Sequence, residues 1–393
     1  MSGSVIVAGA RTPIGKLSGA LGSFSATDLG GFAIAAALER SGVAPDQVDY
    51  VFMGQVIQAG AGQITARQAA TKGGVPMDVA STTVNKVCLS GLNAIYLADL
   101  MINAGEADIV VAGGMESMTQ APYLLPGARG GYRIGDGTLV DSMMYDGLFC
   151  AFDQCAMGLG TERYNGADGV SREQQDEFSA QSHQRAAAAI AAGKFAEEIV
   201  PVEVPQRKGD PTIVGTDEGV RGDTTAESLA KLRPAFDKSG TITAGNASQI
   251  SDGAAAVVVM SASRAEQLGV TPLGELVSYG QVAGPSPSLL SQPSHATQVA
   301  LKKAGLGVGD IDLFEINEAF AAVGLTSAAD LGISADIVNV NGGAIALGHP
   351  VGMSGTRLAL TSLLELRRRG GGTAAVSLCG GGGQGDAAIL RTR

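Results

Sequence analysis

Three residues of nucleophilic or proton-transferring type stand out in this chain of 393 residues, two cysteines and a histidine, together with one asparagine that can hydrogen-bond. Cys88 follows a short β-type run and precedes an apolar-periodic helix that starts near Leu92. A thiol at a helix start lies near free backbone N–H groups and the positive end of the helix dipole, which favour a nucleophilic thiolate. The alternative is a buried, inert thiol, the commoner state of a cysteine in an apolar context.

Cys379 follows a predicted strand, 374–378, and precedes four glycines. A thiol in this position points at whatever the loop encloses, and the free N–H groups of such a loop suit an oxyanion. The alternative is a phosphate-binding glycine loop. The Lys-Ser or Lys-Thr ending of a P-loop is missing, however, which disfavours that alternative.

His349 lies in a second glycine-rich stretch, 339–350, before a helix predicted at 357–366. On this stretch alone, a catalytic histidine and a structural one held by the backbone fit equally well. Asn317 joins a strand end to a helix, and the plainest interpretation of it is a helix N-cap.

A metal site made of Cys88, Cys379 and His349 is a further alternative. Their spacing is far from the paired-cysteine framework of zinc sites, so no metal is expected. The remaining cysteines, Cys150 and Cys155, fall in a loop-rich region and are interpreted as structural thiols.

The elements that must position these residues alternate between strand and helix. Strands are predicted at 4–8, 48–53 and 108–112, and helices at 28–39 and 66–72. After Asp108, the last of these strands is apolar throughout (Ile109, Val110, Val111), as expected of a strand buried on both faces. The pattern indicates an α/β fold with a largely parallel sheet.

The C-terminal part repeats this pattern. Residues 42–53 align without gaps with residues 305–316, an offset of 305 − 42 = 263. Two further short matches fall at nearly the same offset, one of them pairing 90–92 with 354–356. These matches indicate two copies of one α/β half, with chance similarity as the alternative.

Between the two copies the texture changes to glycine-rich loops, proline-punctuated strands and a polar helix at 171–193, capped by Ser171. His183, in that helix, and His295, at a helix start, are expected at the surface or as caps. The predicted domains are an N-terminal half (1–117, completed by 246–270), a loop domain (118–245) and a C-terminal half (271–393).

Composition restricts the class of protein further. The chain is 45% hydrophobic and 17% charged, with a formal net charge of −11, which argues against nucleic acid or an anionic membrane as the main partner. No apolar run approaches the roughly 20 residues that span a bilayer. The first residues lack a signal-peptide pattern, and four cysteines do not make a disulfide framework, so a cytoplasmic location is expected.

Taken together, four motifs resemble those of the thiolase family. The resemblance extends from residues 10–13 to Ala388 and implies a thiolase fold, with two similar α/β halves in a layered αβαβα arrangement and an inserted loop domain. It also implies reversible condensation of two acetyl-CoA molecules to acetoacetyl-CoA, or thiolysis of that product, through an acyl-thioester on Cys88. The motifs are Asn-Lys-Val-Cys-Leu-Ser-Gly at 85–91, Asn-Glu-Ala-Phe at 317–320, Gly-His-Pro at 348–350 and Cys-Gly-Gly-Gly-Gly-Gln-Gly at 379–385.

The same resemblance implies the catalytic roles. Cys88 takes the acyl group, and His349 activates it by drawing off its proton. Cys379 acts as acid and base at the methyl group of the second acetyl-CoA. One oxyanion hole uses the N–H groups of Cys88 and Gly381, and the other uses His349 with a water held by Asn317.

Coenzyme A enters this scheme as a substrate, and no permanently bound cofactor is expected. The resemblance places Arg221 and Ser228 near the nucleotide and Ala244 and Ser248 at the pantetheine. Two departures, Ala156 where the family often has histidine and the bulky Leu89, bear on acyl-chain preference. The full set expected at the coenzyme and acyl group is Leu148, Met157, Arg221, Ser228, Ala244, Ser248, Ala319 and Phe320.

Three rival functions remain. A longer-chain 3-ketoacyl-CoA thiolase has the same catalytic residues and a different pocket, and a thiolase-like acyl-CoA binder lacks the nucleophile or the histidine. A 3-ketoacyl synthase uses a cysteine with two histidines, whereas Asn317 and Cys379 stand where the second histidine is sought. The resemblance further implies a homotetramer, a dimer of dimers.

Overall fold

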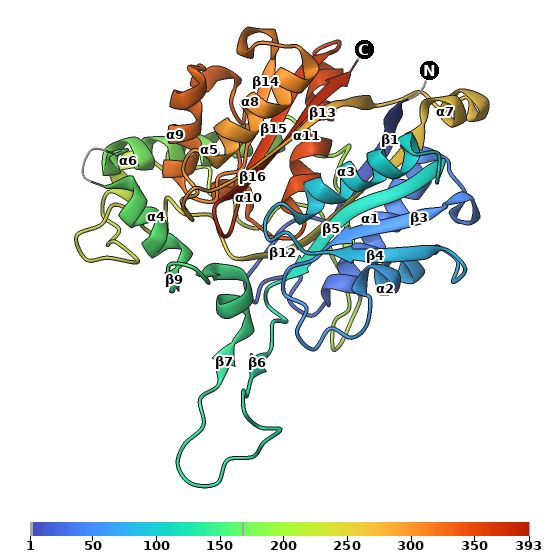
Figure 1. Ribbon diagram of the computed structural model, residues 1–393. Helices are drawn as coiled ribbons and strands as arrows, with labels where there is room; N and C mark the ends of the chain where they lie inside the picture. The colour runs from blue at the N-terminus through green and yellow to red at the C-terminus, as the bar shows by residue number, and fades with distance from the viewer. Residues whose placement is uncertain (1–2, 167–168, 393) are drawn as a thin grey trace.

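The computed structural model describes residues 3–166 and 169–392 (Figure 1). Residues 1, 2 and 393, at the ends of the predicted domain ranges, lie outside this description. The N-terminal elements are β1 (Ser4–Arg11), β2 (Gly15–Lys16), α1 (Ala26–Ser41), η1 (Pro45–Gln47), β3 (Tyr50–Gly54), α2 (Thr65–Lys72), β4 (Ala80–Val84), α3 (Ser90–Asn103) and β5 (Ile109–Ser117).

The middle segment has short strands and four helices before the chain returns to long strands. Its elements are β6 (Tyr123–Leu124), β7 (Val140–Asp141), η2 (Met143–Leu148), β8 (Phe149–Cys150), β9 (Cys155–Ala156), α4 (Met157–Asn165), α5 (Arg172–Ala191), β10 (Val202–Val204), β11 (Thr212–Val214) and α6 (Ala226–Leu229).

The remaining elements start with a long buried strand. They are β12 (Ser251–Ser261), α7 (Ala262–Leu268), β13 (Gly274–Ala283), α8 (Gln292–Ala304), η3 (Val308–Asp310), β14 (Leu313–Ile316), α9 (Ala321–Leu331), η4 (Ala335–Ile337), α10 (Ala344–Leu347), α11 (Ser354–Arg368), β15 (Gly372–Gly380) and β16 (Gln384–Thr392).

The long strands form one mixed sheet in the order β14-β15-β16-β13-β1-β12-β5-β3-β4, with β2 beside β12. Its C-terminal strands (β14, β15, β16 and β13) join the N-terminal strands where β13 pairs with β1, at Val5↔Glu275 and Ile6↔Gly274. The prediction of a largely parallel sheet is wrong, because β12, β13 and β16 pair antiparallel with their neighbours. Hydrophobic periodicity reports burial, and it does not report the direction of the neighbouring strand.

Helices and strands alternate in five layers, which confirms the predicted αβαβα arrangement. One apolar cluster joins α1 and α2 to the strands of the N-terminal part. A second cluster, with α3 and α11 at its centre, lies between the two sets of strands. A third joins α8 to β14, β15 and β16. Figure 1 shows the two halves side by side, in blue to cyan and in orange to red.

The internal repeat is visible in the elements themselves. α1 and α8 each end at a left-handed glycine, Gly42 with φ 68° and Gly305 with φ 69°. In both copies a three-residue 3-10 helix and a buried strand follow, η1 with β3 and η3 with β14. The aligned segments 42–53 and 305–316 therefore form the same structure, while the proposed domain boundaries stay a prediction.

Small residues allow the first turns of α3 and α11 to touch. A Cβ added at Gly91 would lie 2.7 Å from Thr356 Oγ1, and one added at Gly355 would lie 2.4 Å from Leu92 N. Thr356 Oγ1 also donates a hydrogen bond to the Gly91 carbonyl, at 3.0 Å. The loops before these two helices, which carry Cys88 and His349, are held against each other as a result.

The inserted segment contains the predicted polar helix as α5, and Ser171 caps it by accepting a hydrogen bond from Gln174 N. β6 and β7 form the base of an arm that extends away from the body in Figure 1. Within the described residues, no helix has the length and apolarity needed to cross a membrane.

Candidate active site

Cys88 lies in a tight turn two residues before α3. Val87 adopts φ 50°, a strained conformation for a β-branched residue. Ser90 stabilises the turn, because its Oγ accepts a hydrogen bond from Lys86 N at 2.8 Å and donates one to the Val87 carbonyl at 2.6 Å. The first amides of α3 have no side-chain cap.

The Cys88 thiol does not have the low pKa expected from its place at a helix start. Burial raises its pKa to about 12, with a smaller contribution from the Glu116 carboxylate, and a backbone hydrogen bond opposes the shift. Loss of solvation therefore outweighs the helix terminus. The thiol stays protonated at neutral pH until a neighbouring base takes its proton.

His349 lines the same cavity as Cys88 and is the candidate for such a base, and its partners indicate its tautomer. The Ser354 hydroxyl donates its one proton to the Pro350 carbonyl, at 3.0 Å. We therefore assign the ring hydrogen to His349 Nδ1, which lies 2.6 Å from Ser354 Oγ, and this assignment leaves Nε2 to face the Asn317 amide donor. Burial and the nearby Arg357 lower the pKa of His349 to about 3, so Nε2 is an unprotonated acceptor.

Asn317 is buried next to this free nitrogen, with its Nδ2 3.4 Å from His349 Nε2. The prediction that it caps a helix is wrong, since α9 starts at Ala321 and its N-cap is Phe320. Among the described residues, Asn317 Oδ1 is one of the buried oxygens that have no hydrogen-bond partner. An oxygen in that state favours a water or ligand donor beside it.

Cys379 is buried near the end of β15, and Gly381 follows in the turn to β16. Burial raises the pKa of the Cys379 thiol, and proximity to Cys88 adds to the shift. A Cβ added at Gly381 would approach Val87 Cγ1 to 3.4 Å. The glycine turn and the nucleophile loop therefore pack against each other.

One small cavity, about 50 Å³ in volume, joins most of the residues predicted from the sequence. Its lining is drawn from both halves and the inserted segment. The predicted residues among those that line it are Cys88, Leu148, Met157, Ser248, Ala319, Phe320, His349, Cys379 and Gly381.

A larger cavity of about 470 Å³ adjoins it and shares Leu148, Met157, Ser248, Phe320 and His349 with it. Ala244 and Ala156 line only this outer cavity. Arg221 and Ser228 line neither one and are exposed on the loop before α6 and on α6 itself. The structure therefore gathers most of the predicted residues around the small cavity and places Ala244 at the outer one. Asn317, Arg221 and Ser228 line neither cavity.

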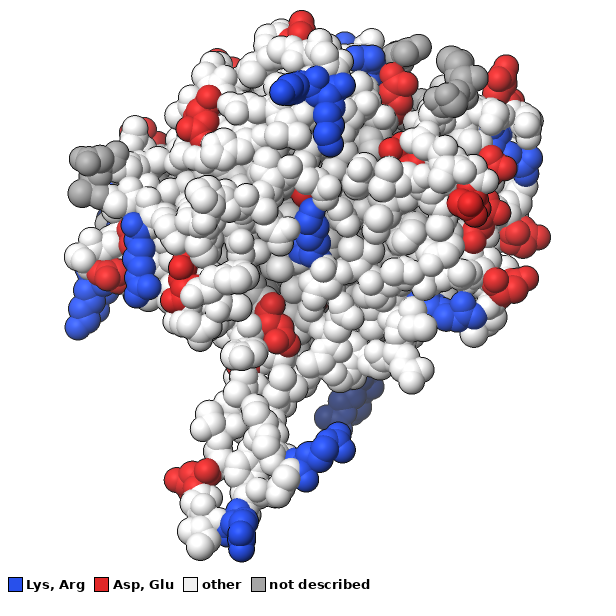
Figure 2. All heavy atoms as spheres, in the orientation of Figure 1, with Lys and Arg blue, Asp and Glu red and all other residues white. Residues whose placement is uncertain are grey.

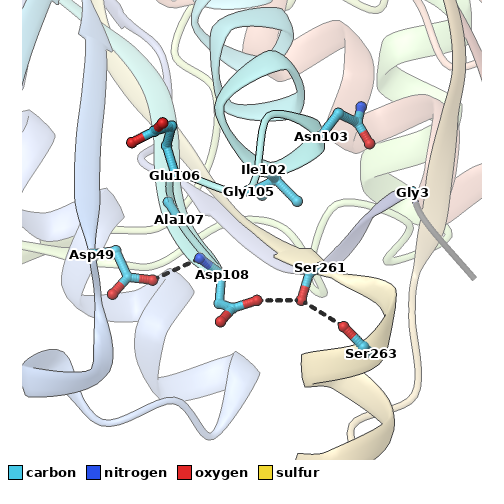
Figure 3. Close-up of a pocket in the computed structure, with 10 residues that line it drawn as sticks. All are labelled: Gly3, Asp49, Ile102, Asn103, Gly105, Glu106, Ala107, Asp108, Ser261 and Ser263. Atoms are coloured by element: carbon cyan, nitrogen blue, oxygen red, sulfur yellow. Dashed lines mark hydrogen bonds between the residues drawn. The ribbon is translucent and has the colours of Figure 1, made fainter.

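The pocket drawn in Figure 3 lies elsewhere, at the ends of β5 and β12, and none of the predicted site residues lines it. Two of its acidic groups, Asp49 and Asp108, have partners within the fold. Asp49 accepts hydrogen bonds from the amides of Asp108 and Ile109, and Asp108 accepts one from Ser261 Oγ. This pattern fits strand-end capping.

Sequence reasoning missed three supporting side chains. Ser354 lies five residues after His349, as the first residue of α11, and that closeness is the signal that could have found it. Lys86, inside the nucleophile motif, forms an ion pair with Asp386 on β16, at 2.7 Å. No local pattern reveals this pair, because the two residues are far apart in the sequence.

The prediction that His183 lies at the surface or acts as a cap is wrong. The side chain is fully buried, and its Nδ1 accepts a hydrogen bond from Arg221 N at 3.2 Å. The reason is that α5 packs against the loop before α6. His295 is exposed near the start of α8, as expected. Within 3–166 and 169–392, no three His, Cys, Asp or Glu side chains are grouped to hold a metal.

Comparison with known proteins identifies the family. Residues 4–263 match the thiolase N-terminal domain, and residues 270–392 match the thiolase C-terminal domain. The chain is 60% identical to a probable acetyl-CoA acetyltransferase of Mycolicibacterium smegmatis, over 98% of this chain and all of that protein. It is 53% identical to the acetyl-CoA acetyltransferase of Cupriavidus necator over both full lengths, and 50% identical to that of Pseudomonas aeruginosa over 99% of each. The protein belongs to the thiolase family, and its fold is the thiolase fold.

Proposed function

We propose that the protein is an acetyl-CoA C-acetyltransferase that condenses two acetyl-CoA molecules to acetoacetyl-CoA and coenzyme A, and catalyses the reverse thiolysis. The observation that carries this proposal is the convergence of Cys88, His349 and Cys379 on one small cavity. Full-length relatives with this activity in their names support it. In this reaction coenzyme A is a substrate, and a permanently bound cofactor is not needed.

The first step forms the acyl-enzyme. His349 Nε2 takes the Cys88 proton, and the thiolate attacks the carbonyl carbon of acetyl-CoA. The N–H groups of Cys88 and Gly381 stabilise the oxyanion, a contribution of about 3–4 kcal/mol for such a donor. The intermediate collapses to the Cys88 thioester, and the departing coenzyme A thiolate takes a proton from Cys379, which becomes the thiolate base of the second step.

The second step forms the carbon–carbon bond. Cys379 removes a proton from the methyl group of the second acetyl-CoA, and the resulting enolate oxygen lies near His349 and a water on Asn317. The enolate carbon attacks the Cys88 thioester, and the Cys88 thiolate leaves and takes its proton back from His349. The unpaired Oδ1 of Asn317 supports this arrangement, because this oxygen can accept a hydrogen bond from the water.

The size of the inner cavity supports the short-chain substrate. Its volume, about 50 Å³, has room for roughly three or four water-sized atoms. An acetyl group has about that many non-hydrogen atoms. The pantetheine arm lies in the outer cavity past Ala244 and Ser248. The exposed Arg221 and Ser228 bind the nucleotide.

A thiolysis assay tests the proposal. Purified protein is mixed with coenzyme A and 3-ketoacyl-CoA substrates of increasing length, alongside Cys88→Ser. We expect Cys88-dependent cleavage that falls steeply beyond four carbons. Equal rates on long-chain substrates would indicate a 3-ketoacyl-CoA thiolase of fatty-acid oxidation instead. No turnover by folded wild-type protein would indicate a protein that only binds acyl-CoA.

We further propose that the enzyme is a cytoplasmic homotetramer, a dimer of dimers. β4 ends the strand order of the sheet, which leaves an edge for a second copy. The arm between β6 and β7 has exposed Leu125, Ile134 and Leu139. Figure 2 shows few charged side chains over the middle of the face from which this arm extends. Light scattering on protein that lacks residues 125–139 tests whether the arm holds two dimers together in the tetramer. We expect the shortened protein to be a dimer.

A further inference from the structure

Cys150 and Cys155 oppose each other across a short ribbon in the inserted segment. β8 ends with Cys150, β9 begins with Cys155, and the two are register partners in an antiparallel pair. Cα atoms of opposed residues in such a pair lie about 4.5–5.5 Å apart, within the roughly 4.4–6.8 Å that a disulfide spans. Both thiols are free. We propose that these cysteines form a reversible disulfide, a redox-responsive staple beside the substrate channel.

The strand pleat places the two thiols on the face of the ribbon away from the substrate. Phe149 and Ala156 are the neighbouring register partners, and Ala156 lines the outer cavity. Successive side chains of a strand point to opposite faces, so the cysteines face α4 instead. Even a Cβ added at Gly160 of α4 would remain 3.7 Å from Cys155 Sγ, which leaves room for the sulfurs to rotate.

The thiols are buried but lie under an exposed turn. Cys150 is 3% exposed and Cys155 6% exposed, whereas Phe152 in the turn between them is 73% exposed. Cys150 Sγ accepts one weak hydrogen bond, from Asp153 N at 3.4 Å, which rotation of the side chain gives up at little cost. A two-residue ribbon is a marginal structure, so brief opening of the turn admits a small oxidant.

Hydrogen peroxide is an oxidant of the required class, and the reaction balances. One cysteine thiolate attacks a peroxide oxygen, the O–O bond breaks, and a sulfenic acid and one water form. The second thiol attacks that sulfur, the S–S bond forms, and the second water leaves. The two sulfurs together lose two electrons to the peroxide, and a dithiol reductant reverses the change.

The staple acts on the channel because the ribbon connects two wall residues. Leu148 precedes β8, Met157 follows β9, and both line the inner and outer cavities. Joining Cys150 to Cys155 fixes the separation of these two side chains. The thiol chemistry stands apart from the proposed acyl transfer, while its effect on acyl-CoA binding rests on that function.

The first experiment uses the double variant Cys88→Ser/Cys379→Ser. Since the chain has four cysteines, Cys150 and Cys155 are then its only thiols. Stoichiometric peroxide should remove both thiols, lower the mass by two hydrogen atoms and give a linked peptide that dithiothreitol reverses. A matched control with Cys155→Ser added should give no linked peptide. The proposal would be overturned if the folded double variant kept both thiols after peroxide treatment. It would also be overturned if only sulfinic acids or disulfides between two separate chains formed.

The second experiment compares binding of acetyl-CoA and butyryl-CoA to the oxidised and reduced double variant by calorimetry. We expect oxidation to weaken butyryl-CoA binding about threefold relative to acetyl-CoA. An unchanged ratio would overturn the effect on the channel. Failure of both forms to bind any acyl-CoA would count against the proposed function, while the thiol result would stand.

Discussion

Lys86, two residues before Cys88, and Asp386, on β16, join the two halves of the molecule through an ion pair. Lys86 Nζ lies 2.7 Å and 2.8 Å from the two carboxylate oxygens of Asp386. The Asp386 side chain is fully buried and also accepts a hydrogen bond from the Tyr279 hydroxyl, at 2.7 Å. The loop that carries Cys88 is thereby fixed to β16.

Removing the cation should destabilise the protein. In Lys86→Met the Asp386 carboxylate stays buried without its charge partner, which costs about 3 kcal/mol. Urea unfolding at neutral pH measures the change. The double variant with Asp386→Asn should recover much of the loss, because the unpaired charge is gone. A single variant as stable as the wild type would show that the pair does not hold the loop.

Ser354→Ala should lower kcat in thiolysis by about 10–100-fold with little change in KM. Without Ser354 Oγ, the hydrogen on His349 Nδ1 has no acceptor, and the tautomer with a free Nε2 loses its preference. Ser354→Thr keeps the hydroxyl and should retain most of the activity. If the threonine variant is as impaired as the alanine variant, packing and not the tautomer explains the effect.

Asn317→Ala should separate the two steps of the reaction. Loss of an oxyanion-hole group typically lowers kcat by about 10²–10³-fold. Transfer of the acetyl group to Cys88, followed by isotope exchange between acetyl-CoA and coenzyme A, should continue at close to the wild-type rate, because the second oxyanion site is not used there. Equal loss of exchange and condensation would place Asn317 in both steps.

The raised pKa of Cys88, about 12, predicts how the free enzyme reacts with iodoacetamide. Below that pKa the thiolate fraction grows tenfold with each pH unit, so the rate should rise steadily from pH 7 to 10. Cys379→Ser serves as the control that assigns the reacting thiol. A rate that is flat across this range would indicate a thiolate–imidazolium pair with His349 instead.

His183 should make the protein less stable in acid. Burial and the neighbouring Arg221 lower its pKa from 6.5 to about 4, so the folded state prefers the neutral ring. This contribution is fully present above pH 6.5 and is lost as pH falls toward 4. The free energy of unfolding, measured at pH 7 and pH 5, should therefore vary less in His183→Gln. The prediction would be wrong if the free energy of unfolding changed by the same amount between pH 7 and pH 5 in the wild type and in the variant.

The sequence allowed prediction of the features that local patterns encode. Residues 109–112 are apolar and form part of the buried strand β5, and Ser171 caps α5 as its type suggests. The motifs around Cys88 and His349 indicated the site. Strand direction was missed, because apolar alternation is the same in parallel and antiparallel strands.

Tertiary environment explains the other errors. The helix start near Cys88 suggested a low thiol pKa, but desolvation, which depends on packing from the other half, reverses that direction. Asn317 resembles a helix cap in sequence, yet the helix starts four residues later. His183 lies in a polar helix, and only the loop packed on it shows that the ring is buried.

The wide separation of the site residues along the chain has a consequence during synthesis. His349 follows Cys88 by 349 − 88 = 261 residues, and Asp386, which holds the nucleophile loop through Lys86, comes later still. A growing polypeptide on the ribosome therefore carries a thiol with neither its base nor its anchor. In the proposed mechanism acyl transfer needs β15 and β16 in the fold, so we expect incomplete chains not to consume acetyl-CoA.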